Sequence, residues 1–282
     1  MGDLAIQEIV CCMGQPVAGN PSQFMMERAF AAAGLDWRYL TLEVTPSDLG
    51  DAVRGMRAMG FRGGNFTLPH KVAVIEFLDR LSEAAELMGA VNCVAREGEE
   101  LVGENTDGKG FVESLREQTD PQGKSVALFG AGGAARAIAV ELALAGASHI
   151  TVFNRTAERG ESLVELLSTK TDAEAELVVW ETPVEIPESA DVVINATSIG
   201  LGAPDDRLAI EPASFRPSQI VADVVFNPVR TAFLREAEAA GCQVVDGLGM
   251  LVNQGVISFR IWTGRDPDRS VMREALEEFL EV

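Results

Sequence analysis

Residues that bind metal ions are scarce in this chain. It has two histidines, and its four cysteines, Cys11, Cys12, Cys93 and Cys242, include no C-x-x-C pair. Structural zinc sites need clustered thiolates and imidazoles at short spacings. The sequence therefore predicts no metal site, and the cysteines are expected to be buried, reduced thiols.

Long apolar segments are also missing. Even the apolar region 125–153 carries Arg136 and Glu141, whereas a membrane span requires about 20 predominantly apolar residues. The N-terminus holds Asp3 and Glu8 in place of the basic segment that opens a secretory signal. We therefore expect a cytoplasmic protein that does not enter the membrane.

Positive charge is in the minority, with 23 Lys and Arg against 43 Asp and Glu and a formal net charge of −20. Such an excess repels the nucleic acid backbone, so no nucleic-acid partner is expected. An anionic ligand also needs Arg, Lys or backbone N–H groups close to it. These groups must outweigh the negative potential of the whole protein at the binding site.

The chain is long and apolar enough to bury a large core. Its 282 residues, 47% of them hydrophobic, stand at the length where chains begin to divide into two domains. In the second half, short apolar strands at 126–129, 150–153, 177–180, 191–195 and 220–226 are separated by helical segments and loops. This alternation predicts a parallel α/β sheet.

A glycine-rich turn joins the first of these strands to a helix. The turn reads Gly130-Ala131-Gly132-Gly133-Ala134, and a second strand follows the helix. Gly130 permits the tight turn, while Gly132 and Gly133 let backbone amides approach a pyrophosphate at the helix N-terminus. A tight turn that binds nothing is the alternative. The strand before the turn and the helix after it favour a dinucleotide site.

The residues after the second strand indicate which dinucleotide binds. Roughly twenty residues past the glycine turn, an NAD-binding unit carries an acidic residue for the ribose 2′-hydroxyl. Here Arg155 occupies that position, and Arg159 follows one turn later. Two guanidiniums suit a 2′-phosphate through charge and bidentate geometry, and so favour NADP. The alternative is a pair of helix-face arginines that balance Glu158 and Glu161.

Several polar residues in the first half have a structural as well as a chemical interpretation. Lys71 precedes an expected helix at 72–81 and is either a surface charge or a functional amine placed against the helix dipole. Asp107 is either the N-cap of an expected helix at 110–118 or the partner of Lys71 in proton transfer. Ser22 is expected to cap a helix at 23–33, and His70 to be a helix-terminal polar residue and not a catalyst.

Together, these motifs resemble those of the shikimate dehydrogenase family over nearly the whole chain. They are Gly14-Gln15-Pro16-Val17-Ala18, Asn65-Phe66-Thr67-Leu68-Pro69-His70-Lys71, Gly89-Ala90-Val91-Asn92, Asn105-Thr106-Asp107-Gly108, Gly130-Ala131-Gly132-Gly133-Ala134-Ala135-Arg136, Asn154-Arg155-Thr156, Asn195-Ala196-Thr197 and Gly247-Leu248-Gly249-Met250-Leu251. Their shared order is more specific than any single motif.

The resemblance implies an α/β protein of two domains. An N-terminal α/β substrate domain would span residues 1–108 and be completed by 248–282, and a Rossmann-like doubly wound parallel sheet at 109–247 would bind NADP. Lys71 and Asp107 would be the catalytic pair, and Thr67, Asn92 and Gln254 would hold ring hydroxyls of the substrate. The cofactor would be held by Gly130, Ala131, Gly132, Gly133, Ala134, Asn154, Arg155, Thr156, Arg159, Thr197, Val224 and Gly247.

Two departures from the family bear on the substrate. The family loop that grips the shikimate carboxylate reads His-Ser-x-Ser, and a tyrosine after the Asp223 strand adds a hydroxyl. Here the loop reads Gly19-Asn20-Pro21-Ser22, and Phe226 stands at the tyrosine position. Asn20 and Ser22 remain substrate-binding candidates because both can donate a hydrogen bond, whereas Phe226 cannot. One lost bond to a charged acceptor costs on the order of 1.5–3 kcal/mol of binding.

The resemblance thus implies an NADP-dependent dehydrogenase of aromatic amino acid biosynthesis, the chorismate pathway. It would act on a small cyclic hydroxy acid, converting 3-dehydroshikimate to shikimate, as a monomer or homodimer. The same chemistry on quinate or an amino analogue is one alternative, and a non-catalytic NADP-binding regulatory protein is another. Methylene-tetrahydrofolate dehydrogenases also use a lysine, but the Asn105-Thr106-Asp107-Gly108 motif does not point to them.

Overall fold

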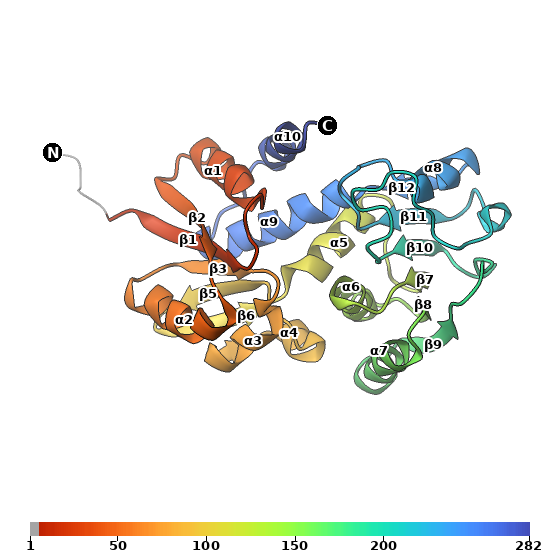
Figure 1. Ribbon diagram of the computed structural model, residues 1–282, viewed down its shortest axis with the longest axis horizontal. Helices are drawn as coiled ribbons and strands as arrows, with labels where there is room; N and C mark the ends of the chain where they lie inside the picture. Colours follow the sequence, from red (N-terminus) through yellow and green to blue (C-terminus); the bar gives the residue numbers. More distant parts are fainter. Residues whose placement is uncertain (1–5) are drawn as a thin grey trace. The chain divides into compact units, whose positions relative to one another are not determined.

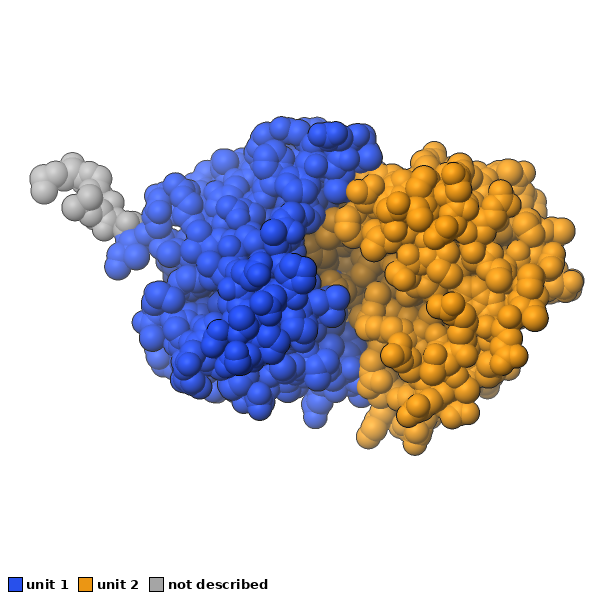
Figure 2. All heavy atoms as spheres, viewed as in Figure 1, with its two compact units in different colours: residues 1–106, 255–282 blue, residues 107–254 orange. Residues whose placement is uncertain are grey.

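The computed structural model describes residues 6–282, which form two compact units (Figures 1 and 2). One unit comprises the chain up to Thr106 together with Gly255–Val282, and the other comprises Asp107–Gln254. The chain passes between them inside two helices, α5 (Thr106–Arg116) and α9 (Gly247–Thr263). Asp3 lies outside the described residues. Within residues 6–282, no helix combines the length and the apolar character needed to cross a bilayer.

The first unit is built on a mixed six-stranded sheet of order β2-β1-β3-β5-β6-β4. The strands are β1 (Glu8–Gly14), β2 (Trp37–Glu43), β3 (Gly63–Phe66), β4 (Arg80–Leu81), β5 (Cys93–Glu97) and β6 (Glu100–Glu104). The helices of this unit, besides its share of α9, are α1 (Ser22–Ala32), α2 (Leu49–Ala58), α3 (His70–Ala73), α4 (Glu83–Met88) and α10 (Arg269–Leu280). Strand β1 runs parallel to β2 and β3, so their carboxyl ends share one edge.

Two local predictions for this unit are wrong. The helix expected at 72–81 is a single turn, α3, followed by a 3₁₀ segment (Val74–Phe77) and the strand β4. Two β-branched residues, Val74 and Ile75, weaken helix propagation there, and Leu78 adopts an extended conformation. Ser22 is the first residue of α1 and not its cap, since the capping position is Pro21, which makes no side-chain cap bond.

The second unit is the expected doubly wound sheet. Its strands are β7 (Ser125–Phe129), β8 (His149–Asn154), β9 (Glu174–Val179), β10 (Val192–Asn195), β11 (Ile220–Asp223) and β12 (Gln243–Val245). They pair in the order β12-β11-β10-β7-β8-β9, all in parallel. The helices α6 (Gly133–Leu144), α7 (Ala157–Lys170) and α8 (Ala232–Ala239) complete the unit with its shares of α5 and α9. Counted from β7, this is the strand order of a dinucleotide-binding fold.

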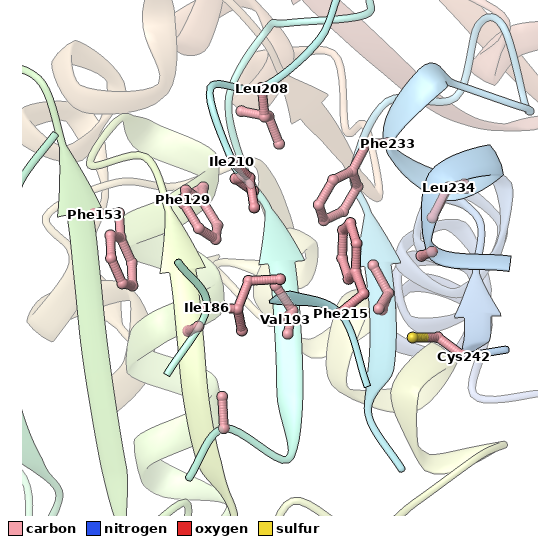
Figure 3. Packing of buried hydrophobic residues seen from close by; sticks show 14 of the residues in the cluster. Phe129, Phe153, Ile186, Val193, Leu208, Ile210, Phe215, Phe233, Leu234 and Cys242 are labelled. Atoms are coloured by element: carbon pink, nitrogen blue, oxygen red, sulfur yellow. The ribbon is translucent and has the colours of Figure 1, made fainter. Parts of the chain in front are cut away.

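An aromatic core supports the carboxyl ends of the central strands (Figure 3). Phe129 and Phe153, the facing residues at the ends of β7 and β8, stack with ring centroids 4.5 Å apart. Trp180 meets Phe129 edge to face, and its indole N–H donates to Ala209 O at 2.9 Å. Buried aromatic pairs of this kind hold their strands in fixed register. The chain switches direction in the sheet between β7 and β10, and parallel α/β sheets bind ligands at such a point.

Candidate cofactor and substrate sites

The glycine turn leaves β7 as the spacing predicts. Gly130 has φ of 115°, in the region that favours glycine, and its N–H donates to Phe153 O at 2.8 Å. Helix α6 begins at Gly133, and a Cβ placed on Gly132 or Gly133 meets no atom within 4 Å. Both glycines are exposed and line a cavity, so a ligand can approach the positive end of α6 there. This arrangement fits a dinucleotide pyrophosphate.

Replacing Gly130 tests the turn. A Cβ there lies 2.8 Å from Ala196 O, so Gly130→Ala should cost about 1–3 kcal/mol of stability through backbone strain and weaken NADPH binding. Thermal melts and NADPH titration measure both effects. Gly123→Ala is the matched control, because Gly123 also has positive φ but its Cβ meets nothing within 4 Å. Equal NADPH affinity in the two variants would contradict the steric argument.

A cavity of about 440 Å³ opens above this turn. Nine of the twelve expected cofactor residues line it: Gly130, Ala131, Gly132, Gly133, Ala134, Asn154, Arg155, Thr197 and Val224. The expected cofactor residues did not include Trp180, Ala196, Ser198, Ile199, Leu201, Val225 or Phe226, which line the same cavity. Most of these follow β10 and β11, so the strand ends were the usable signal.

Arg159 lies on a neighbouring cavity of about 540 Å³ with Arg136, Glu158 and Ser162. Both cavities share the wall formed by Ala131, Gly132 and Gly133. The two arginines expected at the 2′-phosphate therefore line two different cavities that share this stretch of the glycine turn.

Thr156 and Gly247, also expected at the cofactor, line neither of these two cavities. The Asn154 amide donates to Thr156 O at 2.7 Å and so fixes the turn that presents Arg155. A Cβ on Gly247 comes within 2.4 Å of Val225 O and 2.8 Å of Val224 O. The glycine lets α9 approach the loop after β11, which is a packing role.

Lys71 is the second residue of α3, directly after a tight connection from β3. Thr67 N donates to Met13 O at 2.9 Å, and Val91 N donates to Lys71 O at 2.7 Å. The buried His70 ring bonds Val44 O at 2.8 Å, so His70 is structural, as expected. Burial raises the pKa of the Cys12 thiol to about 11, although the Lys71 charge opposes that shift. Cys12 lies near the carboxyl end of β1.

Asn92 fixes the backbone that precedes Asp107. Its Oδ1 accepts from Thr106 N at 2.6 Å, and its Nδ2 donates to Thr106 Oγ1 at 3.0 Å. Helix α5 starts at Thr106, so Asp107 sits in its first turn. The alternative in which Asp107 is only the N-cap of a helix at 110–118 is therefore wrong, because the helix begins before Asp107. Negative charge in a first turn is stabilised by the helix dipole.

A buried polar chain continues behind Asn92. Asn65 Nδ2 donates to Asn92 O at 3.0 Å and to Ser258 Oγ at 3.4 Å, and Asn65 Oδ1 accepts from Tyr39 Oη at 2.7 Å. Burial raises the pKa of Tyr39, which is also hydrogen-bonded to Ser22. Sequence reasoning missed Tyr39 and Ser258, because an isolated tyrosine in a strand and a serine inside a helix give no motif.

The loop at the expected carboxylate end turns its polar groups inward. Asn20 Nδ2 donates to Cys12 Sγ at 3.7 Å, and Asn20 Oδ1 accepts from Ser22 N at 2.8 Å. Both ends of the Asn20 amide are therefore engaged within the first unit. In the second unit, Gln254 donates to Leu251 O at 2.9 Å, and Phe226 lines the cofactor cavity.

Family models match three parts of the chain. A shikimate dehydrogenase substrate-binding domain matches residues 12–94, a shikimate/quinate 5-dehydrogenase domain matches 113–201, and a shikimate 5-dehydrogenase C-terminal domain matches 247–277.

Full-length relatives extend the match. A shikimate dehydrogenase (NADP(+)) of Methanothermobacter thermautotrophicus is 43% identical, with 95% of each chain covered. The crystal structure of a 5-ketofructose reductase of Gluconobacter sp. strain CHM43 is 50% identical with a TM-score of 0.95, covering 97% of this chain and 99% of that one. A Thermus thermophilus shikimate 5-dehydrogenase in complex with NADP(H) and shikimate is 36% identical with a TM-score of 0.86, covering 97% and 100%.

Proposed function

This chain belongs to the shikimate dehydrogenase family, and we propose that it interconverts 3-dehydroshikimate and shikimate by hydride transfer with NADP(H). The proposal is carried by the open glycine turn and its cavity, on a chain 43% identical to an NADP-dependent shikimate dehydrogenase. The sequence predictions of the family, the two-domain α/β fold, the enzyme class and the cofactor NADP are confirmed. The chain is an NADP-dependent dehydrogenase.

The residues of the chain have distinct parts in this reaction. NADPH, when bound, supplies the hydride. Lys71 donates a proton to the ring oxygen as its negative charge develops, and Asp107 accepts from Lys71 and from a neighbouring substrate hydroxyl. A positioned donor is worth about 10²–10⁴ in rate. Thr67, Asn92 and Gln254 are proposed to orient the ring hydroxyls, and Arg155 and Arg159 to hold the 2′-phosphate.

A second substrate class is favoured by three observations. Both ends of the Asn20 amide are already bonded within the protein, and Phe226 offers no donor. The Cys12 bond uses one of the two N–H groups of the Asn20 amide, so at most one remains for a carboxylate, and Phe226 supplies none. The Gluconobacter 5-ketofructose reductase, at 50% identity, is named for a substrate without a carboxylate. We therefore propose an uncharged polyhydroxy ketone as the second candidate substrate.

A substrate panel separates the two candidates. NADPH oxidation is measured with 3-dehydroshikimate and with 5-ketofructose, and NADP⁺ reduction with shikimate, quinate and an amino analogue. A higher kcat/KM for 3-dehydroshikimate supports the first candidate, and a higher kcat/KM for 5-ketofructose supports the second. Absence of turnover with every compound would contradict both.

Restoring the family residues should improve shikimate binding. Asn20→Ser with Phe226→Tyr adds hydroxyl donors to a charged acceptor, worth on the order of 1.5–3 kcal/mol, so the KM for shikimate should fall about tenfold or more. The KM for 5-ketofructose, which has no carboxylate, should not fall. The single variants show which position contributes. An unchanged KM for shikimate in the double variant would remove the carboxylate argument.

A further inference from the structure

One wall of the cofactor cavity comes from two loops at neighbouring strand ends. Ala196, Thr197, Ser198, Ile199 and Leu201 follow β10, and Val224, Val225 and Phe226 follow β11. Arg155 follows β8, on the opposite side of β7 in the sheet. Because a dinucleotide lies across the switch point, the β10–β11 wall faces the half of the cofactor that carries the reacting ring.

We propose that Asp223 is a positioning residue for hydride transfer, whose buried carboxylate ties these two loops into a single wall. The proposal rests on the proposed NADP-dependent reaction. Asp223 is 1% exposed, at the end of β11. Its Oδ1 accepts from Asn195 Nδ2 and from Val225 N, both at 2.9 Å, and its Oδ2 accepts from Thr231 Oγ1 at 2.6 Å.

The bond to Val225 holds the β11 loop directly. Val225 lines the cavity, as do its chain neighbours Val224 and Phe226. Thr231, held by the other carboxylate oxygen, caps α8 by accepting from Leu234 N at 3.3 Å. The carboxylate therefore fixes the start and the end of the segment that joins β11 to α8.

The bond to Asn195 holds the β10 loop indirectly. Asn195 and Asp223 are register partners on adjacent strands. Because an ionised carboxylate only accepts, it sets the Asn195 amide with Nδ2 toward Asp223. Asn195 Oδ1 then accepts from Thr197 N at 3.0 Å and Thr197 Oγ1 at 2.7 Å, and Thr197 Oγ1 accepts from Ile199 N at 3.0 Å.

The buried Asp223 carboxylate holds the two loops in place but lowers the stability of the folded protein at neutral pH. Burial raises the pKa of Asp223 to about 6, against the opposing effect of its three hydrogen bonds. Because the pKa is raised, the protonated group contributes stability to the folded protein at low pH. This contribution is lost as the pH rises through about 6. The fold therefore keeps an unfavourable buried charge at neutral pH, as strained or destabilised groups at functional sites do.

Asp223→Asn tests the proposal at pH 7.5. The amide has the same shape but only one acceptor oxygen. Its Nδ2 faces either the donors of Asn195 and Val225 or the Thr231 hydroxyl, whose proton then loses its acceptor. The loops should therefore shift while the buried charge disappears. We expect kcat/KM for NADPH to fall about 10- to 100-fold, since small displacements of reacting groups cost up to 10²-fold, with Tm unchanged or higher. Affinity for 2′,5′-ADP, which probes the Arg155 end, should stay within about twofold of the wild-type value, because Arg155 follows β8, on the other side of β7 from the two loops.

Two further variants separate a positioning role of Asp223 from a general effect of removing a carboxylate. Asp191→Asn is the matched control, because Asp191 bonds Ser125 N at 2.9 Å at the amino edge of the same sheet, and it should leave kcat/KM unchanged. Exchanging the pair, Asn195→Asp with Asp223→Asn, restores a donor facing an acceptor and should recover part of the lost rate. Wild-type kinetics in Asp223→Asn, or a loss of Tm and 2′,5′-ADP binding that parallels the loss of rate, would overturn the positioning role. Failure of the wild-type protein to oxidise NADPH would instead contradict the proposed function.

Discussion

Lys71→Ala should lower kcat by about 10²–10⁴-fold, the contribution of a positioned general acid, while NADPH still binds. Lys71 is held by its backbone, since its carbonyl accepts from Val91 N at 2.7 Å, so truncation of the side chain leaves that connection in place. The cofactor turn belongs to the second unit, and NADPH affinity should therefore be maintained. The measurements are steady-state kcat and NADPH titration by fluorescence.

A control variant and a second variant are needed to interpret the loss of turnover in Lys71→Ala. Lys170→Ala removes an exposed ammonium at the end of α7 and should retain wild-type kcat. Asp107→Asn provides a second test, because the amide keeps the shape of the side chain but loses its charge. A Lys71→Ala enzyme that keeps more than about a tenth of the wild-type turnover, far above the 10²-fold loss expected, would show that another group protonates the alkoxide.

The cofactor site was the more predictable of the two sites because its physics is local. A strand, a glycine turn and a helix follow one another in sequence, and Gly130, Gly132 and Gly133 occupy the turn that this order requires. The network that organises the far wall is not local. Asp223 and Asn195 are 28 residues apart, and only the pairing of β10 with β11 brings them together.

The substrate residues were less predictable for the same reason. The resemblance supplied Asn20 as a candidate, but its amide is engaged by Cys12 and Ser22, a contact that no spacing rule specifies. The one-turn α3 was missed because the apolar pattern at 72–81 suits a helix, while the chain turns instead into the short strand β4. Helical periodicity describes which residues are buried and does not determine where the backbone must turn to reach the sheet.

The double variant Arg155→Ala with Arg159→Ala should abolish the preference for NADPH over NADH. Each guanidinium that bonds the 2′-phosphate contributes on the order of 1.5–3 kcal/mol, so loss of both should reduce kcat/KM for NADPH by at least about 100-fold. NADH lacks the phosphate, and its kcat/KM should change by less than about threefold, as for removal of surface charges. The measured quantity is the ratio of the two kcat/KM values.

The overall charge of the chain makes this effect larger at low salt. A protein of net charge −20 repels a phosphate at long range, so binding depends on the local cations at the turn that Asn154 and Thr156 shape. Raising the ionic strength from 0.01 M to 0.15 M shortens the Debye length from about 30 Å to about 8 Å and should weaken the charge-assisted bonds of the wild-type enzyme. The double variant, which lacks both guanidiniums while the net negative charge of the protein remains, should instead lose little NADPH affinity, or gain some, as salt rises. Parallel salt dependence in the two proteins would place the 2′-phosphate away from Arg155 and Arg159.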